Sequence, residues 1–299
     1  MEKPPIYLVD ASIYIFRAYY SMPSTLVNRL GQSVNAVYGY TNFLLDLLEL
    51  EPDYISCAFD ESLNTCFRNE IYPDYKANRE MPDANLEFQL ASCQEITALL
   101  GVHSVCRQDF EADDIIGTIQ KKLGGERRTI IVTRDKDLGQ LLRDDDLLWD
   151  FAADDYAGPS EIKAKFGVLP SQIADYLALA GDTVDNIPGA SGVGAKSAAI
   201  LLNHFGDIDY LYDRIDEVAH LEGLRGAKKI QSTLIEQEAK VRNFRQVTRI
   251  MCDIDFNLTL EDLRPARFCL DSLADFCHRM SFGDRVISRI AALERKTRG

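Results

Sequence analysis

Short apolar runs alternate with amphipathic stretches over the first half of the chain, from residue 5 to about 155. The apolar runs have the length of strands and are rich in β-branched or aromatic residues: IYLV (6–9), YISCAF (54–59), RTIIVT (128–133) and LLWDF (147–151). Between them, VYGYTNFLLDLLEL (37–50) and ADDIIGTIQKKL (112–123) have the apolar spacing of helices. This alternation predicts a parallel sheet with helices on both faces, and a ligand site outside the carboxyl ends of its strands.

The second half of the chain has a different pattern. Residues 160–299 predict helices separated by Gly and Pro breaks, at GVLP (167–170), NIPGASGVG (186–194) and HFGD (204–207). The length of 299 residues and the 46% hydrophobic content fit one large domain or two packed domains. We therefore expect an α/β core followed by a helical subdomain.

Composition also limits where the protein acts. The chain has no apolar run of about 18 residues, and its start, MEKPPIYLVDAS, lacks the basic and apolar stretches of a signal peptide. Seven cysteines without a CxxC pair are typical of reduced thiols. These features predict a cytoplasmic protein that makes no membrane contact.

An aspartate follows three of the predicted strands. Asp10 directly follows the first run, Asp60 directly follows the second, and Asp135 comes shortly after the third. A single aspartate in such a position usually caps a helix or closes a turn. Because the carboxyl ends of parallel strands share one edge of a sheet, three of them together favour a functional site.

Further acids cluster near the ends of other predicted elements. They are Glu111, Asp113, Asp114, Asp137, Asp182 and Asp185. Acids in a first helical turn are also common as partners of the helix dipole, but so many carboxylates together would repel one another without cations. Oxygen ligands favour Mg²⁺ or Mn²⁺, and the sequence has no His/Cys spacing of the zinc type. We therefore expect two Mg²⁺ ions, about 4 Å apart, for attack of water on a phosphodiester.

Two basic motifs indicate what the substrate is. YPDYKANRE (72–80) places Tyr75, Lys76 and Arg79 together, although a solvated helix start would also explain them. PGASGVGAKSAAILL (188–202) combines a Gly-x-Gly turn, a lysine and the start of an apolar helix. This is a helix-hairpin-helix pattern, in which main-chain N–H groups and the lysine bind a DNA phosphate. A plain helical corner is the other interpretation.

The distribution of charge supports nucleic acid more than its sum does. The net charge is −14, yet residues 225–249 carry seven Lys and Arg against two Glu. A local basic surface is the feature that matters for binding a polyanion. The sequence therefore predicts such a surface on an acidic protein.

Five motifs in order carry a resemblance to a known family. They are FDE (59–61), YKANR (75–79), EADD (111–114), TRDKDL (133–138) and GDTVDNIPGASGVGAKSA (181–198). Together they resemble the 5′ nuclease domain of bacterial DNA polymerase I, within the flap endonuclease family of 5′→3′ exonucleases. The resemblance implies a PIN-like α/β core at 1–158 with a helical arch at about 72–100, and a helical subdomain at 159–299 with a helix–three-turn–helix at about 170–205 and C-terminal helices. With 299 residues, we expect a stand-alone nuclease or an excised domain, without a polymerase.

The resemblance also implies roles for individual residues. The metal ligands would be Asp10, Asp60, Glu111, Asp113, Asp114, Asp135, Asp137, Asp182 and Asp185, with one ion drawing chiefly on the last three. Lys76 and Arg79 would contact the scissile phosphate, and Tyr75 would stack on a base beside it. The duplex-binding turn would be Gly192, Val193, Gly194, Ala195, Lys196 and Ser197. Similar proteins hold K⁺ there with main-chain carbonyls, which here would belong to Leu179, Ala180, Pro188, Ala190 and Val193.

The implied activity is that of a Mg²⁺-dependent, structure-specific 5′ nuclease of DNA replication and repair, with Mn²⁺ able to replace Mg²⁺. Its substrate would be branched or flapped duplex DNA, with an RNA–DNA hybrid as a further candidate, and it would act as a monomer. A PIN-type ribonuclease is an alternative, although it would need neither the arch nor the 188–198 turn. A junction-binding protein without catalysis is the other alternative, but no carboxylate of the ligand set is missing.

Overall fold

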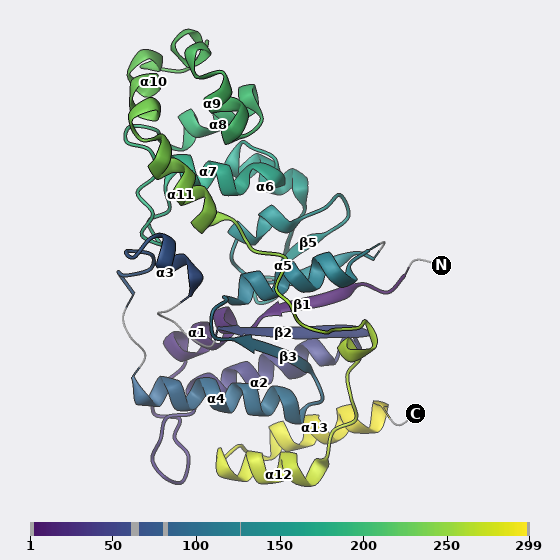
Figure 1. Ribbon diagram of the computed structural model, residues 1–299. Helices are drawn as coiled ribbons and strands as arrows, with labels where there is room; N and C mark the ends of the chain where they lie inside the picture. Colours follow the sequence, from purple (N-terminus) through teal and green to yellow (C-terminus); the bar gives the residue numbers. More distant parts are fainter. Residues whose placement is uncertain (1–2, 61–65, 80–82, 126, 298–299) are drawn as a thin grey trace. The chain divides into compact units, whose positions relative to one another are not determined.

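The computed structural model describes residues 3–60, 66–79, 83–125 and 127–297. The chain divides into two compact units (Figure 1). Unit 1 comprises Met1–Leu63, Met81–Arg134 and Cys252–Gly299, and unit 2 comprises Asn64–Glu80 and Asp135–Met251. This division differs from the boundary expected between residues 158 and 159, because Asn64–Glu80 and residues 135–158 fall in unit 2, while Cys252–Gly299 falls in unit 1. Glu61 and residues 80–82 of the expected arch lie outside the described residues.

Unit 1 is built on four parallel strands in the order β3-β2-β1-β4. Their bounds are β1 (Ile6–Asp10), β2 (Tyr54–Asp60), β3 (His103–Arg107) and β4 (Thr129–Val132). β1 and β2 are almost wholly buried, which agrees with their continuous apolar runs. The sequence pattern does not predict β3, because HSVCR is an edge strand that is only half-buried and lacks an apolar run.

Helices cover both faces of this sheet, with α5 on one face and α1, α2 and α4 on the other (Figure 1). Their bounds are α1 (Ala11–Ser21), α2 (Asn35–Leu48), α4 (Ala84–Leu99) and α5 (Ala112–Leu123). α4 falls within the range of the expected arch, but it packs against α2 and β3 as part of the core. Gln89 of α4 is fully buried and accepts a 2.7 Å hydrogen bond from the N–H of Ala36. That bond satisfies a donor in the first turn of α2, where helices lack internal partners.

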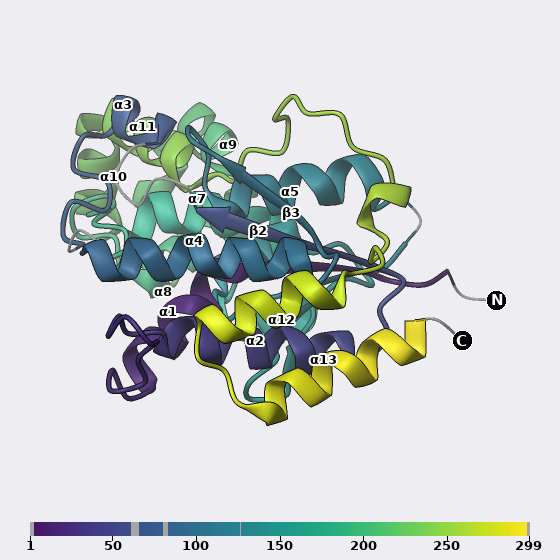
Figure 2. The ribbon, with the colours of Figure 1, turned by 90° about the horizontal axis from the view of Figure 1, so that it is seen from below.

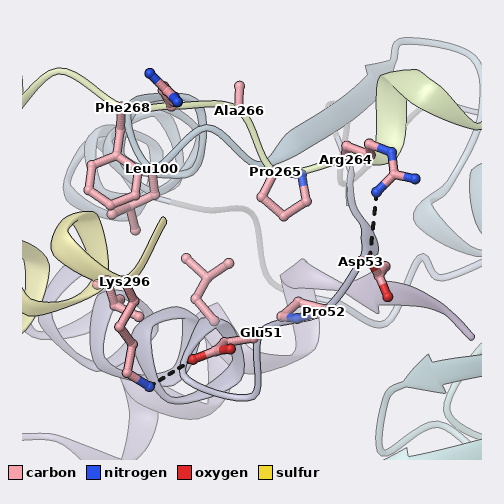
Figure 3. Close-up of a pocket in the computed structure, with 12 residues that line it drawn as sticks. Glu51, Pro52, Asp53, Leu100, Arg264, Pro265, Ala266, Phe268 and Lys296 are labelled. Atoms are coloured by element: carbon pink, nitrogen blue, oxygen red, sulfur yellow. Dashed lines mark hydrogen bonds and ion pairs between the residues drawn. The ribbon is translucent and has the colours of Figure 1, made fainter. Parts of the chain in front are cut away.

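The last part of the chain completes unit 1. It contains η4 (Glu261–Leu263), α12 (Leu270–Arg279) and α13 (Asp284–Thr297), with α12 beside α4 and α13 beside α2 (Figure 2). The segment that leads into α12, residues 264–268, closes one side of a pocket of about 480 Å³ (Figure 3). The ion pairs Lys296–Glu51 (2.9 Å) and Arg264–Asp53 (3.6 Å) lie in its wall. Because Asp53 immediately precedes β2, this pocket lies at the amino end of that strand.

Unit 2 is mostly helical and contains one short hairpin among its described residues. In the hairpin, β5 (Leu147–Asp150) pairs with β6 (Asp155–Ala157) in antiparallel orientation, a pairing that the expected parallel sheet does not include. The helices are α3 (Phe67–Ile71), η1 (Asp137–Leu141), α6 (Pro159–Phe166), η2 (Pro170–Gln172), α7 (Ile173–Ala180), α8 (Ala195–Phe205), α9 (Ile208–Asp213), η3 (Ile215–His220), α10 (Ala227–Glu236) and α11 (Glu238–Thr248).

The connection between α7 and α8 folds tightly on itself. Gly189 has a φ of +69°, and a Cβ at this position would lie 2.4 Å from the main-chain nitrogen of Gly181. Asp182 and Ile187 exchange two main-chain hydrogen bonds of 2.7 Å. Because only glycine allows both this φ and this approach, Gly189 fixes the turn at residues 182–187.

The seven cysteines are all free thiols. Burial raises the pKa of Cys57 to about 12, as expected for a thiol that serves packing rather than reaction. None of the helices in the described ranges combines the length and the apolar character needed to cross a membrane.

Candidate active site

Asp10 and Asp60 lie at the carboxyl edge of the unit 1 sheet. Asp10 ends β1 and pairs in register with Ala58, two residues before Asp60 at the end of β2. One carboxylate oxygen of Asp10 accepts from the Thr133 hydroxyl (3.0 Å) and the other from the N–H of Ile13 (3.4 Å). Asp10 therefore caps α1, as a structural aspartate would, at the edge predicted for the site.

The start of α5 brings further acids to the same edge. Asp60 Oδ1 accepts a 2.8 Å hydrogen bond from the N–H of Ala112, the first residue of the helix. Asp114 is fully buried and accepts from the N–H of Glu111 (3.1 Å), as in a capping box. Glu111 and Asp113 are partly exposed. Unit 1 thus collects five of the predicted ligands at one edge: Asp10, Asp60, Glu111, Asp113 and Asp114.

Unit 2 contains the other four predicted ligands, Asp135, Asp137, Asp182 and Asp185. Asp135 Oδ1 accepts from the N–H of Asp137 (2.8 Å), where η1 begins. Burial, followed by the charges of the other three carboxylates, raises the pKa of Asp137 to about 8. Burial also raises the pKa values of Asp135 and Asp182, and the charge of Asp185 adds to both. Mutual effects of this kind mean that the four carboxylates lie near one another.

Asp185 is the carboxylate that contacts YPDYKANRE (72–80), called the basic motif from here on. Arg79 Nη2 donates to Asp185 Oδ1 (2.8 Å), and the Tyr75 hydroxyl donates to Oδ2 (3.1 Å). Lys76 Nζ lies 3.8 Å from the same Oδ2. Unit 2 therefore brings the two side chains predicted to contact the phosphate, and the tyrosine predicted to stack on a base, onto one predicted metal ligand.

The Tyr75 ring is placed differently from what base stacking requires. Its side chain is 5% exposed, and the cations of Arg68 and Lys76 lie 6.0 and 4.9 Å from its ring centre. A base can stack on this ring only after it turns outward. In the structure its hydroxyl supports Asp185 instead.

The donor set suits a hard divalent cation. All nine predicted ligands offer carboxylate oxygens, which Mg²⁺ and Mn²⁺ prefer. Burial is the main cause of the raised pKa of Asp137, and the negative charges of Asp135, Asp182 and Asp185 add to it, so a bound cation would favour its ionised form. Within the described residues, no three His, Cys, Asp or Glu side chains are gathered closely enough to hold a metal ion. The nine carboxylates are divided between the two units.

The predicted duplex-binding turn is open to solvent. Gly192, Gly194, Ala195 and Lys196 are exposed, Ser197 is partly exposed, and Val193 is buried beneath them. α8 begins at Ala195, and the first N–H groups of a helix lack internal partners. Lys196 makes no ion pair with the described residues. The start of α8 and this lysine are therefore available to bind a phosphate.

Two of the carbonyls predicted to hold K⁺ already accept hydrogen bonds. Leu179 O accepts from the N–H of Ala190, and Ala190 O from the N–H of Val193, both at 2.9 Å. A carbonyl oxygen has two lone pairs, so each can still bind a cation. The K⁺ site, which also includes the carbonyls of Ala180, Pro188 and Val193, stays a prediction.

The basic surface expected at residues 225–249 is smaller than its sequence suggests. Arg242 pairs with Glu238 (2.8 Å) and with Asp209 (2.7 Å). Arg245 pairs with Asp175 (2.7 Å) and with the same Asp209 (2.6 Å). A local count misses Asp175 and Asp209, which come earlier in the chain. The exposed basic residues in the range are Arg225, Lys228, Lys229, Lys240 and Arg249.

Two asparagines without a predicted role connect the basic motif (72–80) to the turn at residues 182–187, called the aspartate turn below. Asn78 Nδ2 donates to Thr183 O (3.2 Å), and Asn186 Nδ2 donates to Asp74 O (2.7 Å). The signal was weak because amide side chains carry no charge and asparagine is common in turns. Their partners are main-chain carbonyls, which leave no trace in a sequence.

Both parts of the chain match known families. Residues 5–167 match the 5′–3′ exonuclease, N-terminal resolvase-like domain, and residues 168–269 match the 5′–3′ exonuclease, C-terminal SAM fold. The DNA polymerase I of Pseudomonas aeruginosa is 34% identical over 285 residues, which cover 94% of this chain and 31% of that protein. The 5′–3′ exonuclease of Buchnera aphidicola subsp. Schizaphis graminum is 31% identical over 286 residues, which cover 95% of this chain and 99% of that protein. The chain thus spans about a third of the polymerase and nearly all of the exonuclease.

Solved structures share the fold at lower identity. The T5 5′-exonuclease with bound divalent metal ions (zinc) has a TM-score of 0.65 at 20% identity, covering 98% of each chain. The catalytic core of Rad2 in complex with DNA substrate has a TM-score of 0.64 at 15% identity, covering 98% of this chain and 92% of that one. The α/β, resolvase-like core and the helical SAM-type fold are therefore both confirmed. Through these matches over nearly its whole length, the chain belongs to the 5′–3′ exonuclease family.

Proposed function

We propose that this chain is a structure-specific 5′ nuclease that hydrolyses DNA phosphodiesters near junctions of single strand and duplex. It would act both as a 5′→3′ exonuclease and as a flap endonuclease. The observation that carries the proposal is the contact of Asp185 with Tyr75, Lys76 and Arg79. Carboxylates that can bind metal ions lie beside basic side chains that can bind a phosphate, and phosphodiester hydrolysis uses both.

The nine carboxylates would hold two Mg²⁺ ions, with Mn²⁺ able to replace them. When bound, such ions activate water for in-line attack and neutralise the charge that develops on the phosphate. Binding of a cation would also be coupled to the protonation of Asp137. Because its pKa is raised to about 8, it holds a proton at neutral pH and would release it when a cation binds.

The remaining side chains would bind and orient the substrate. Lys76 and Arg79, now on Asp185, would turn to the scissile phosphate and stabilise its developing charge. The start of α8 with Lys196 would hold the duplex backbone, and the carbonyls of the preceding turn would hold K⁺. Flapped DNA and RNA–DNA hybrids are the proposed substrates. One chain carries every proposed ligand, so a monomer suffices.

A cleavage assay on a 5′-labelled DNA flap in a nicked duplex tests this proposal. We expect short labelled products in Mg²⁺, none in EDTA, and none from the labelled single strand alone. Asp135→Asn should abolish cleavage, because it removes a charge from the carboxylate cluster. Asp145→Asn is the matched control, since Asp145 is exposed in the same unit outside the cluster, and it should cleave normally.

The same assay separates the alternatives. A PIN-type ribonuclease would cut a labelled RNA strand and leave the DNA flap intact. A junction-binding protein would shift the flap in a gel without cutting it in either Mg²⁺ or Mn²⁺. Either result would refute the proposed activity.

A further inference from the structure

The basic motif is docked onto the aspartate turn by two kinds of contact. The charged contacts run from Lys76 and Arg79 to the Asp185 carboxylate. The neutral contacts are Lys76 N–H to Asp185 O (3.1 Å), Asn78 Nδ2 to Thr183 O (3.2 Å), Asn186 Nδ2 to Asp74 O (2.7 Å) and Tyr72 hydroxyl to Asn186 O (3.2 Å). All of these residues belong to unit 2.

The two kinds of contact differ in what can compete with them. A divalent cation competes for the Asp185 carboxylate, and a DNA phosphate competes for Lys76 and Arg79. Both ligands bind these charged groups more strongly than they bind the amide, hydroxyl and carbonyl groups of the neutral set. We therefore expect the neutral contacts to persist when the charged ones are exchanged for metal and substrate.

Asn186 is central to the neutral set. Its side chain donates to Asp74 and its carbonyl accepts from Tyr72, so it links the motif on both sides of the turn. It has a left-handed φ of +58°, which asparagine tolerates better than most residues. Lys76 also has a left-handed φ, +54°, although lysine does not favour it. Such a conformation persists only where the surrounding contacts impose it.

The basic motif is also held by contacts that do not involve the aspartate turn. Asn69 Nδ2 donates to Tyr75 O (3.0 Å), which ties the motif to α3. The guanidinium of Arg68, 2% exposed, donates to Val247 O (2.8 Å) and to Arg249 O (3.3 Å) at the end of α11. These hydrogen bonds connect the basic motif and α3 to the rest of unit 2.

We propose that Asn186 is a positioning residue that keeps Lys76 and Arg79 beside the carboxylates after Asp185 releases them. It touches neither substrate nor metal and acts through the main chain of the motif. This inference rests on the proposed nuclease function. Its consequence is that the cations are already in place when the phosphate arrives, which lowers the cost of orienting them.

Replacement of Asn186 by glycine tests the inference. Asn186→Gly keeps the left-handed φ and removes the amide donor. The matched control is Asp154→Gly, because Asp154 is also left-handed (φ +51°), lies in the same unit and loses one side-chain hydrogen bond, from Trp149. We expect faster amide hydrogen exchange at residues 72–79 in Asn186→Gly than in the control, measured without metal.

Kinetics supply the second readout. In single-turnover cleavage of the flap, Asn186→Gly should be slower on the order of 10- to 100-fold, because misplaced groups lose rate rather than affinity. The Kd for the flap, measured by fluorescence anisotropy in Ca²⁺, should change less than twofold. In a variant that already carries Lys76→Ala and Arg79→Ala, Asn186→Gly should reduce the cleavage rate little further, because Asn186 acts through those two residues.

Several outcomes would overturn the inference. One is equal exchange and equal rates in Asn186→Gly and the control. Another is an undiminished cost of Asn186→Gly in the background that lacks both cations. If the wild-type chain cuts no substrate, the proposed function fails, while the exchange experiment still decides whether Asn186 docks the motif.

Discussion

Asp10, Asp60, Asp114 and Asp135 each accept a hydrogen bond from a main-chain N–H at the start of an element or turn. Each of them therefore has a structural role, in capping a helix or closing a turn. The two roles are compatible, because a carboxylate that receives one hydrogen bond has further lone pairs for a cation. The set of metal ligands stays a prediction from the sequence, and the sequence did not indicate how burial would affect the pKa values of these carboxylates.

Asp137 gives this point a measurable form. Its pKa of about 8 in the folded protein lies above the ~3.9 of an unfolded Asp, so the folded chain retains a proton that the unfolded chain loses between about pH 4 and 8. The stability of the metal-free protein should therefore fall as pH rises through this window, by at most ~1.4 kcal/mol per pH unit from this group. Urea unfolding in EDTA at several pH values measures the slope.

The comparison between variants isolates this contribution. Asp137→Asn should flatten the fall in stability, because its side chain does not titrate. Asp145→Asn, at an exposed site, should leave the slope as it is in the wild type. Identical slopes for all three proteins would show that Asp137 titrates normally.

At the scale of elements, a strong apolar pattern was sufficient to predict a helix or strand, and a weak pattern was not. The predicted helix 112–123 coincides with α5, and the four predicted strands overlap β1, β2, β4 and β5. β3 and β6 were missed because one is a half-buried edge strand and the other has three residues. The packing of α4 on the core could not be predicted, since its contacts depend on segments far away in the sequence.

The segment 264–268 shows how such distant contacts hold an element. Ala266 N–H donates to Gly101 O (2.8 Å), and a Cβ on Gly101 would lie 2.1 Å from Ala266 O. Gly101→Ala should therefore displace this segment and reduce the free energy of unfolding by about 2 kcal/mol or more. Urea denaturation with an intrinsic fluorescence readout would measure the loss.

Gly31→Ala is the control for the backbone strain alone. Gly31 has a similar φ of +78°, but no atom lies within 4 Å of the added Cβ, so its cost should be about 1 kcal/mol. Equal losses in the two variants would mean that segment 264–268 adapts to the extra methyl group without cost.

At the scale of the whole molecule, net charge says little about partners. The chain carries −14, yet Lys196 stands unpaired among the described residues at the start of α8. Arg242, by contrast, is committed to Glu238 and Asp209. Two basic residues that look equivalent in the sequence thus differ in the charge that they offer to DNA, and ion pairs with distant acids make the difference.

The salt dependence of DNA binding should reveal this difference. Lys196→Ala should weaken binding to flapped and plain duplex alike and reduce the slope of log K against log salt by about 1. Arg242→Gln should leave the slope nearly unchanged, because its charge is already neutralised. Fluorescence anisotropy in Ca²⁺ over a salt series measures both, and equal slopes would remove Lys196 from the interface.

The interleaving of the two units along the chain determines the order in which they are finished during synthesis. Unit 1 starts first but needs residues 252–299, whereas unit 2 is complete at residue 251. On the ribosome, the later unit therefore has its full sequence before the earlier one. The order in which the sequences of the two units are completed is therefore the reverse of the order in which they begin. The α2 and α4 surfaces that α13 and α12 cover must wait until the last helices emerge.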